Sequence, residues 1–574
     1  MTRVVAFLTI GTLAYACSDA TTSGPAGNDA GDAGEDAAPA QDAAVLPDAG
    51  ARDVELDADS TDAEHADTGF DAGTPSDTAH DAAGPDRGED GDAGSLDTGW
   101  DDGGSDGHVS EDAGTSDTGF DDAGAADSGT DDSGFSWTGT FDIGRIRDQM
   151  TAECTFSNHR TTVKDGVSVD VWDVSYYSWE SVSGDLKPIL IRAFASKPVS
   201  ADGNLPGVVQ AHGLGGFAEE NHATGLAALL SMFTIAYTGP GGGTAPENTS
   251  EGLPASHNNG YRMFDTVPDL RGSWFWAHAV AAMRALTCLE SRPEVDKSRL
   301  GMTGFSAGSV VTLISSGADN RIKASVPLSG TGAWDVATQS PQAWQHKLLS
   351  QAGLSTASPE WQNLMAGLIT PALMVGNAKA MVLMVNGSTD EFFPLTAHMA
   401  TYDAIPGVDK KTSIAANFDH GCYSVSGVES AKDIEDRASI RSAGGQRMWF
   451  SHWFGTDAKY AYVPAAPVVS VTPAGAATFF AAAVDSGGPD LEVEEVRAWA
   501  SNDDSFVYAS AVLDESGGVY QKLVPFTMQA NTIYFVDVQY KTKSLLLPER
   551  FSISSAPVIP AGLVPHIRSM DNCL

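Results

Sequence analysis

The sequence has few basic residues. Its 574 residues include 33 Lys and Arg against 76 Asp and Glu, which gives a formal net charge of −43 at pH 7. Without a basic face to neutralise a phosphate backbone, DNA and RNA are excluded as expected partners. After the N-terminus, no run reaches the roughly 18 apolar residues of a membrane-spanning helix. His, Cys and Asp do not cluster with metal-ligand spacing either, so we expect no metal and no other cofactor.

The excess of acidic residues is concentrated in one segment. Residues 18–134 hold 33 Asp and Glu but only two basic residues, Arg52 and Arg87, and they repeat Asp-Ala-Gly and Asp-Thr-Gly units. A segment with three aromatics and this much like charge cannot bury enough apolar surface to fold. We therefore predict that residues 17–134 form a disordered acidic tail, and that 135–574 carry the folded core.

The N-terminus has the pattern of an export signal. Residues 1–16 combine one charge, Arg3, with an apolar run at 4–13 and the small-residue ending Ala-Tyr-Ala. Cys17 follows directly and resembles a lipidation site, although Ala14 stands where Leu is more usual. We expect an exported cell-surface or periplasmic lipoprotein tethered to a membrane through Cys17, or alternatively a secreted protein. No protein partner is expected.

Residues 135–460 alternate short apolar runs with amphipathic stretches, which is typical of an α/β domain with a mostly parallel sheet and helices on both faces. The predicted strands are 189–194, 208–211, 233–237, 299–303, 324–328, 381–385 and 413–417, and the clearest helices are 276–290 and 307–316. The helical segment 331–380 interrupts the last strands. We predict that it is an insertion at the active-site end, serving as a lid or as a wall of the substrate site.

A second region follows the Pro-rich link 463–467. Residues 465–574 show strand-like stretches, for example 492–499, 506–513 and 532–540, separated by turn residues. No helix-period segment stands out there. We predict a small C-terminal β-sandwich.

Ser306 is the candidate nucleophile, in the pentapeptide Gly304-Phe305-Ser306-Ala307-Gly308. Small residues two before and two after a Ser permit the sharp strand-to-helix turn that exposes its hydroxyl. The motif alone arises easily in a chain with 60 Gly. Here it lies between a predicted strand and an apolar helix, and this context favours a catalytic role.

A glycine-rich loop supplies the expected oxyanion donors. The strand 208–211 leads into His212-Gly213-Leu214-Gly215-Gly216. In this arrangement one backbone donor comes from the loop and the other from the residue after the nucleophile, so we assign the N–H groups of Leu214 and Ala307. His212, Gly213, Gly215 and Gly216 are expected to support the loop.

The acid and base should follow later strands. Strand 381–385 leads to Asp390, which we prefer to Glu391 because Glu391 should point the other way. Strand 413–417 leads to His420, which completes the order Ser, Asp, His. The other histidines considered are His398, expected on a helix facing the wrong way, and His278, expected to be packed in an apolar helix.

These motifs resemble the acetyl xylan esterase and dienelactone hydrolase branch of the α/β hydrolases, and also the catalytic domain of prolyl-oligopeptidase-like enzymes. The residues that carry the resemblance are HGLGG at 212–216, the segments 269–291 and 295–309, and NGSTDEFFPL at 386–395. The resemblance implies Ser306, Asp390 and His420 as a triad that hydrolyses a small-molecule or polysaccharide ester, with acetyl esters of polysaccharides as the expected substrates. The loop 239–244 departs from the Arg-Gly-Gln loop of typical acetyl xylan esterases.

Two alternatives stay open from the sequence. One is a serine peptidase of the prolyl-oligopeptidase type, and the other is an inactive hydrolase fold that serves as a surface binding protein.

Three disulfide connectivities are possible among the four cysteines that follow Cys17, which are Cys154, Cys288, Cys422 and Cys573. The pair 288–422 is the least favoured, because these residues should lie at opposite ends of the sheet.

Overall fold

The computed structural model describes residues 137–564, except 202, 258–259, 408, 421–438, 504–506 and 545–547. The predicted signal segment 1–16, the predicted lipidation site Cys17 and the predicted acidic tail lie outside the described residues, as do Cys422 and Cys573. Among the residues that are described, no helix is both long and apolar enough to cross a membrane.

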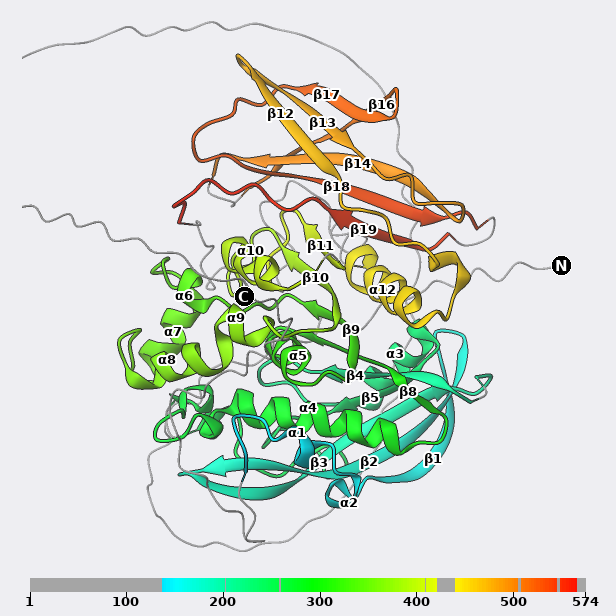
Figure 1. Ribbon diagram of the computed structural model, residues 1–574, viewed down its shortest axis with the longest axis vertical. Helices are drawn as coiled ribbons and strands as arrows, with labels where there is room; N and C mark the ends of the chain where they lie inside the picture. Colours follow the sequence, from blue (N-terminus) through cyan, green and yellow to red (C-terminus); the bar gives the residue numbers. More distant parts are fainter. Residues whose placement is uncertain are drawn as a thin grey trace, which may run out of the picture. The chain divides into compact units, whose positions relative to one another are not determined.

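A long mixed sheet organises the described residues (Figure 1). Its strand order is β1-β2-β3-β5-β4-β8-β9-β10-β11-β19-β18-β14-β15. The first nine of these strands are β1 (Thr155–Lys164), β2 (Val167–Val182), β3 (Asp185–Pro198), β4 (Leu205–Ala211), β5 (Phe233–Tyr237), β8 (Val295–Phe305), β9 (Ile322–Leu328), β10 (Met381–Gly387) and β11 (Lys410–Ala415). From β5 to β11 in this order, neighbouring strands are parallel. Their carboxyl ends therefore meet at one side of the sheet, where ligands bind in open α/β folds.

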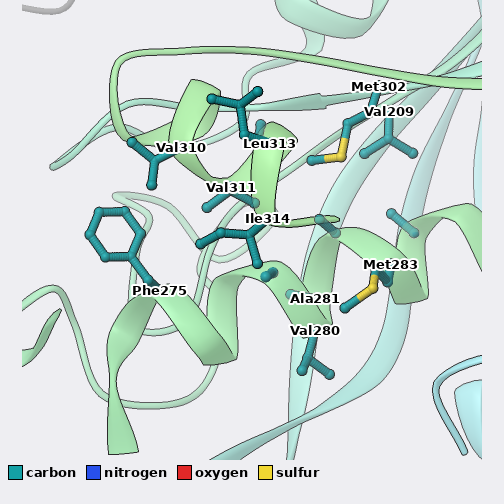
Figure 2. Packing of buried hydrophobic residues seen from close by; sticks show 14 of the residues in the cluster. Val209, Phe275, Val280, Ala281, Met283, Met302, Val310, Val311, Leu313 and Ile314 are labelled. Atoms are coloured by element: carbon teal, nitrogen blue, oxygen red, sulfur yellow. The ribbon is translucent and has the colours of Figure 1, made fainter. Parts of the chain in front are cut away.

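Helices cover both faces of the parallel strands. One face carries α4 (Trp274–Ser291) and α5 (Ala307–Ala318), and the other carries α3 (Glu220–Leu230) and α12 (Gly445–Phe454). Successive residues of β4 point to opposite faces of the sheet and so pack into different cores. Val209 packs with the α4 and α5 side chains, whereas Val208 packs with those of α3 and α12. Figure 2 shows the first of these cores, including Val209, Met302 and Ile314.

The other helical elements are short. The N-terminal ones are α1 (Ile143–Ile146) and α2 (Gln149–Ala152), and 3-10 turns lie at Arg262–Phe264, Leu270–Gly272 and Ala458–Tyr460. The predicted insertion 331–380 contains α6 (Trp334–Ala337), α7 (Trp344–Gln351), α8 (Pro359–Leu364), the π-helical turn Met365–Ile369 and α9 (Pro371–Met374). After it come α10 (Leu395–Ala404) and the π-helical turn Ile440–Gly444. A two-residue ladder pairs β6 (Ser256–His257) with β7 (Gly260–Tyr261).

The C-terminal region consists of two packed β-layers, as the predicted sandwich requires, and one of them continues the long sheet. Strands β14 (Leu491–Ser501), β15 (Ala509–Val512), β18 (Ile533–Thr542) and β19 (Arg550–Ser554) continue the long sheet beyond β11. The second layer is a sheet of β12 (Val468–Ala474), β13 (Ala477–Ala483), β17 (Val519–Val524) and β16 (Asp514–Ser516). Apolar residues of both layers, such as Phe480 and Val496, share one core with α3 and α12. We call the four strands β14, β15, β18 and β19, together with the segment that connects β14 to β15, the C-terminal layer.

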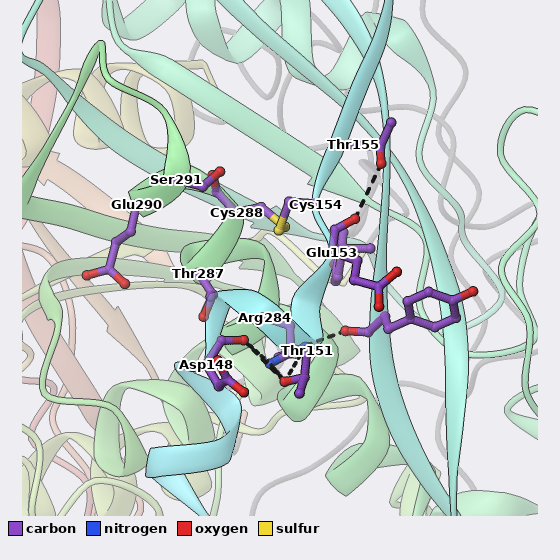
Figure 3. The surroundings of a disulfide bond; sticks show 12 residues. Asp148, Thr151, Glu153, Cys154, Thr155, Arg284, Thr287, Cys288, Glu290 and Ser291 are labelled. Atoms are coloured by element: carbon purple, nitrogen blue, oxygen red, sulfur yellow. Dashed lines mark hydrogen bonds between the residues drawn. A yellow bond between two sulfur atoms is a disulfide. The ribbon is translucent and has the colours of Figure 1, made fainter.

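A disulfide joins Cys154, just before β1, to Cys288 on α4 (Figure 3). Arg284 lies one helical turn away and donates hydrogen bonds to the carbonyl oxygens of Tyr177 and Asp148, at 2.9 Å each. Burial lowers the pKa of Arg284 to about 9. The disulfide and this arginine together fix the first segment of the described chain on α4.

Candidate active site

Ser306 lies at the sharp turn between β8 and α5. Its backbone has φ 58° and ψ −122°, a strained conformation for a non-glycine residue. The turn requires its two flanking glycines, because a Cβ on Gly304 would lie 2.4 Å from the carbonyl oxygen of Gly308, and a Cβ on Gly308 would lie 2.3 Å from that of Ala211. The N–H of Ser306 donates to the carbonyl oxygen of Leu328 on β9 at 3.0 Å. The turn is therefore held by the strands on both sides of β8.

The structure brings Ser306, His420 and Asp390 into one hydrogen-bonded row. Ser306 Oγ lies 2.8 Å from His420 Nε2, and His420 Nδ1 lies 3.0 Å from Asp390 Oδ2. The three residues are 7%, 3% and 2% exposed. An ionised carboxylate only accepts hydrogen bonds, so the proton of a neutral His420 lies on Nδ1, and Nε2 is left to accept the Ser306 hydroxyl proton. This is the order that serine nucleophile activation needs.

The loop after β10 fixes Asp390. Its second oxygen, Oδ1, accepts the backbone N–H groups of Phe392 at 3.0 Å and Phe393 at 2.8 Å. The same loop lies directly against the chain before His420. A Cβ on Gly387 would lie 2.1 Å from the carbonyl oxygen of Phe418, and that oxygen accepts the N–H of Thr389 at 3.2 Å. The acid and the histidine are thus positioned by two interlocked loops.

The sequence predicts that Glu391 points away from the histidine, but the structure shows its carboxylate turned toward His420. Its carboxylate accepts the backbone N–H of His420 at 3.1 Å, while Asp390 accepts from the ring. The physical reason is the close packing of the two loops, which turns both neighbouring carboxylates toward one residue. Burial, and then the charge of Asp390, raise the pKa of Glu391.

The pKa of His420 depends on its burial and on the carboxylates around its ring. Burial alone disfavours the charged imidazolium, but Asp390, through its charge and its hydrogen bond, offsets this and raises the pKa of His420 above the ordinary value. Glu391 and Asp419 act in the same direction. The histidine is therefore a stronger base than an isolated imidazole.

The oxyanion loop lies beside Ser306. A Cβ on Gly213 would be 3.3 Å from Ser306 Cβ, and Ala307 is the first residue of α5, where backbone N–H groups have no intrahelical acceptor. Among the described residues, neither the N–H of Leu214 nor that of Ala307 has a hydrogen-bond acceptor. Both groups are thus available to an incoming oxyanion.

The other predicted loop residues shape the turn itself. Gly215 has φ +75°, which suits glycine, and the N–H of Gly216 closes the turn on the carbonyl oxygen of Gly213 at 3.1 Å. His212 fastens the loop at its base. The N–H of Gly239 donates to His212 Nε2 at 2.7 Å, so the ring proton lies on Nδ1, which donates to the carbonyl oxygen of Gly213 at 2.7 Å. Burial lowers the pKa of His212 to about 4, so the ring stays neutral.

The other histidines weighed from the sequence lie away from Ser306. His398 is buried on α10 with Nε2 at 2.9 Å from Thr412 Oγ1, and burial lowers its pKa to about 3. His278 is buried inside α4, where its ring packs 4.9 Å from that of His212. Neither contacts the Ser306 hydroxyl.

Aromatic side chains enclose His420, and sequence reasoning did not identify their role. Phe305 stacks on its ring at 5.1 Å between centroids, and Phe392 lies at 4.2 Å. The insertion reaches the same place, because Trp344 stacks on Phe392 at 4.9 Å and Gln345 Nε2 donates to the Phe392 carbonyl oxygen at 2.8 Å. The paired Phe residues directly after the acid in DEFFP were the available signal. The insertion therefore supports the acid loop, and its role as a lid stays a prediction.

Within the described residues, no group of three or more His, Cys, Asp or Glu is arranged to hold a metal ion. The arrangement provides instead an activated hydroxyl, a base with an orienting acid, and two free N–H donors. Together these groups are suited to acyl transfer.

Residues 150–331 match the family model of acetyl xylan esterase, AXE1. The chain contains an acetyl xylan esterase-like α/β-hydrolase domain. The matched segment includes the HGLGG loop and Ser306, and it ends before Asp390 and His420. This confirms the resemblance found in the motifs and places the protein among the enzymes that hydrolyse carboxylic esters.

Several solved structures are similar to this esterase-like chain. The acetyl xylan esterase from Paenibacillus sp. R4 is 19% identical, with 48% of this chain and 86% of that chain covered and a TM-score of 0.40. Acetyl xylan esterase 1 from Thermoanaerobacterium sp. JW/SL YS485 is 17% identical, with 51% and 90% covered and a TM-score of 0.40. Est1E from Butyrivibrio proteoclasticus, solved with ferulic acid bound, is 17% identical, with 45% and 95% covered and a TM-score of 0.31. Among curated proteins, none matches the chain.

Proposed function

We propose that the protein is an exported serine esterase that removes acetyl groups from polysaccharides through Ser306, His420 and Asp390. The observation that carries the proposal is the hydrogen-bonded row of 2.8 Å and 3.0 Å between these three side chains, beside two unpaired backbone donors. The acetyl xylan esterase family match supports the acetyl group. The signal-like N-terminus supports export, with Cys17 as the proposed membrane tether.

In the first half-reaction, Ser306 Oγ bonds to the ester carbonyl carbon while His420 Nε2 takes the hydroxyl proton. The carbonyl oxygen becomes an oxyanion that accepts the N–H groups of Leu214 and Ala307. Each such donor typically contributes about 10²- to 10³-fold to the rate. The carbon–oxygen bond to the sugar then breaks, and the leaving sugar oxygen takes the proton from His420, which leaves an acetyl group on Ser306.

In the second half-reaction, water replaces the alcohol. His420 takes a proton from the water as its oxygen bonds to the acetyl carbon, and the same two N–H groups bind the second oxyanion. Collapse of this intermediate breaks the bond to Ser306 Oγ, which recovers its proton from His420, and acetate is released. Asp390 keeps the ring in the required tautomer and stabilises the imidazolium in both steps.

A substrate panel with Ser306→Ala tests this proposal. We expect the wild-type enzyme to release acetate from acetylated xylan and from small acetyl esters, faster than it cleaves longer acyl, feruloyl or glucuronoyl esters. Ser306→Ala should lower kcat by at least about 10⁴-fold, because no other described side chain replaces the nucleophile.

Three results would contradict it. Turnover by Ser306→Ala close to that of the wild type would exclude Ser306 as nucleophile. Cleavage of peptides but not esters would indicate a peptidase. No labelling of the wild-type protein by a fluorophosphonate probe would indicate an inactive fold that serves in binding.

A further inference from the structure

The strand that leads to His420, β11, pairs with one of its two neighbouring strands over a very short length. β11 pairs with β10 along six residue pairs, from Val382 with Lys410 to Gly387 with Ala415. On its other side, β11 pairs with β19 through the single pair of Thr412 and Ser554. The backbone ladder alone therefore attaches the histidine strand only weakly to the C-terminal layer, and side chains complete the connection.

A buried polar cluster holds Ile414, two residues further along β11. Its N–H donates to Ser554 Oγ at 2.9 Å, and its carbonyl oxygen accepts from Arg441 Nε at 2.9 Å. Both partners converge on Asp537 of β18, because Arg441 forms an ion pair with its Oδ2 at 2.5 Å and Ser554 Oγ donates to its Oδ1 at 2.9 Å. All four residues are buried. Buried charges are stable only when they are paired and hydrogen-bonded, so this cluster has one well-defined arrangement.

Asn417 makes the next connection, three residues before His420. Its Nδ2 donates to the carbonyl oxygen of Tyr508 at 2.9 Å, and its Oδ1 accepts the backbone N–H of Tyr508 at 2.7 Å. The side-chain amide thus pairs with the C-terminal layer as a neighbouring strand would. The backbone N–H of Asn417 donates to Ser388 Oγ at 2.9 Å, in the loop that carries Asp390. One residue therefore connects the histidine loop, the acid loop and the C-terminal layer.

Apolar contacts support the same connection. Ile414 and Ala416 pack in one buried cluster with Trp499, Tyr508 and Phe535 of the C-terminal layer. The ring of His420 faces Ser306 and Asp390. Ile414 and Ala416 precede His420 by six and four residues, so this apolar cluster anchors the segment that leads to the histidine.

We infer that the C-terminal layer is part of the catalytic unit, in which Asn417 acts as a positioning residue that holds the His420 loop against Tyr508. This inference rests on the proposed role of His420 as the base. A displacement of about 1 Å in a catalytic group can cost on the order of 10² in rate. Two buried hydrogen bonds three residues from the base are well placed to prevent such a displacement.

Asn417→Gly tests the inference in the full-length protein. Asn417 has φ +58°, which glycine adopts without strain, so this change removes the two side-chain bonds and keeps the backbone conformation. We expect kcat to fall about 10- to 100-fold, with KM within about threefold of the wild-type value. The rate of fluorophosphonate labelling of Ser306 should fall in parallel with kcat, because both need a positioned base.

Val496→Ala is the matched control. Val496 is buried on β14 of the same layer but packs in the core of α3 and α12, not in the cluster of Ile414 and Tyr508. Its truncation should therefore lower the Tm while kcat, measured well below that Tm, stays within about twofold. If Asn417→Gly yields no folded protein, Asn417→Asp is measured instead. Its side chain has the same size but cannot donate to the Tyr508 carbonyl oxygen, and the same fall in kcat is expected.

The outcomes separate the two proposals. A kcat of Asn417→Gly within twofold of the wild-type value overturns the positioning role. The role is also overturned if kcat falls in Val496→Ala as much as in Asn417→Gly for the same loss of Tm. Turnover by Ser306→Ala close to that of the wild type overturns the proposed function itself, whatever the kcat of Asn417→Gly.

Discussion

The two sides of the active site are built in different ways. Ser306 lies in a turn of consecutive residues, since β8, α5 and the glycines at 304 and 308 form it, and the adjacent strands β4 and β9 pack against it. His420 is positioned by segments far along the chain, since Asn417 of its loop binds Tyr508, 91 residues away. The nucleophile side is thus local, and the histidine side depends on tertiary structure.

This difference predicts how substitutions on each side of the active site will act. A change on the nucleophile side should act through strain in one turn. A change on the histidine side should act through charge, tautomer or alignment, and leave the fold largely intact.

Asp390→Asn should have the largest effect, on the histidine side. The amide oxygen of Asn can still accept from Phe392 and Phe393, but its NH₂ group then faces His420 Nδ1. The ring must accept there and carry its proton on Nε2, where it cannot take the proton of Ser306. We expect kcat to fall about 10⁴-fold, equivalent to about 5.5 kcal/mol, with little change in Tm. A fall below tenfold at unchanged Tm would contradict the assigned tautomer.

Gly308→Ala should break the nucleophile side through packing. The added Cβ would lie 2.3 Å from the carbonyl oxygen of Ala211 and 2.7 Å from that of His212, and both are backbone atoms that cannot rotate away. We expect the free energy of unfolding to fall by about 1–3 kcal/mol, measured by denaturant titration. Gly225→Ala, on helix α3, is the control, since the added Cβ would meet only the flexible end of a side chain, Lys164 Cε, at 3.6 Å. Equal stability of the two variants would show that the turn tolerates a side chain.

Glu391→Gln should have the smallest effect and sharpen the comparison through pH. The raised pKa of His420 means that the base is protonated, and activity lost, as pH falls through a value above about 6.5. Removing the Glu391 charge lowers that pKa, although Asp390 and Asp419 still raise it. We expect the acidic limb of kcat/KM to move to lower pH, with kcat on its plateau within tenfold of the wild-type value. A shift to higher pH would contradict this account.

The local side of the site was predictable from the sequence. The strand predicted at 233–237 is β5 itself, and the predicted strand 299–303 and helix 307–316 lie within β8 and α5. Ser306, Asp390 and His420 were proposed from strand-loop junctions, and parallel strands bring such junctions together at one end of a sheet. Their catalytic roles stay predictions until variants are measured.

The nonlocal side was not predictable in the same way. Periodicity identifies a strand but not its partner, so the stretches 492–499 and 532–540 predict a C-terminal sandwich without indicating that β14 and β18 continue the long sheet. The strand predicted at 413–417 ends at Ala415, because Asn417 adopts a positive φ to bind Tyr508. The contact of Glu391 with His420 depends on how two loops interlock, which no spacing in the sequence encodes.

The continuation of the sheet past β11 also bears on solubility. If β11 were an outermost strand, it would present unpaired N–H and C=O groups beside the apolar side chains Ile414 and Ala416, which is a template for aggregation between copies. β19, Ser554 and Arg441 occupy those groups, and Trp499 and Phe535 cover the side chains. The strand that leads to the base is thereby shielded from intermolecular pairing by the same residues that align it.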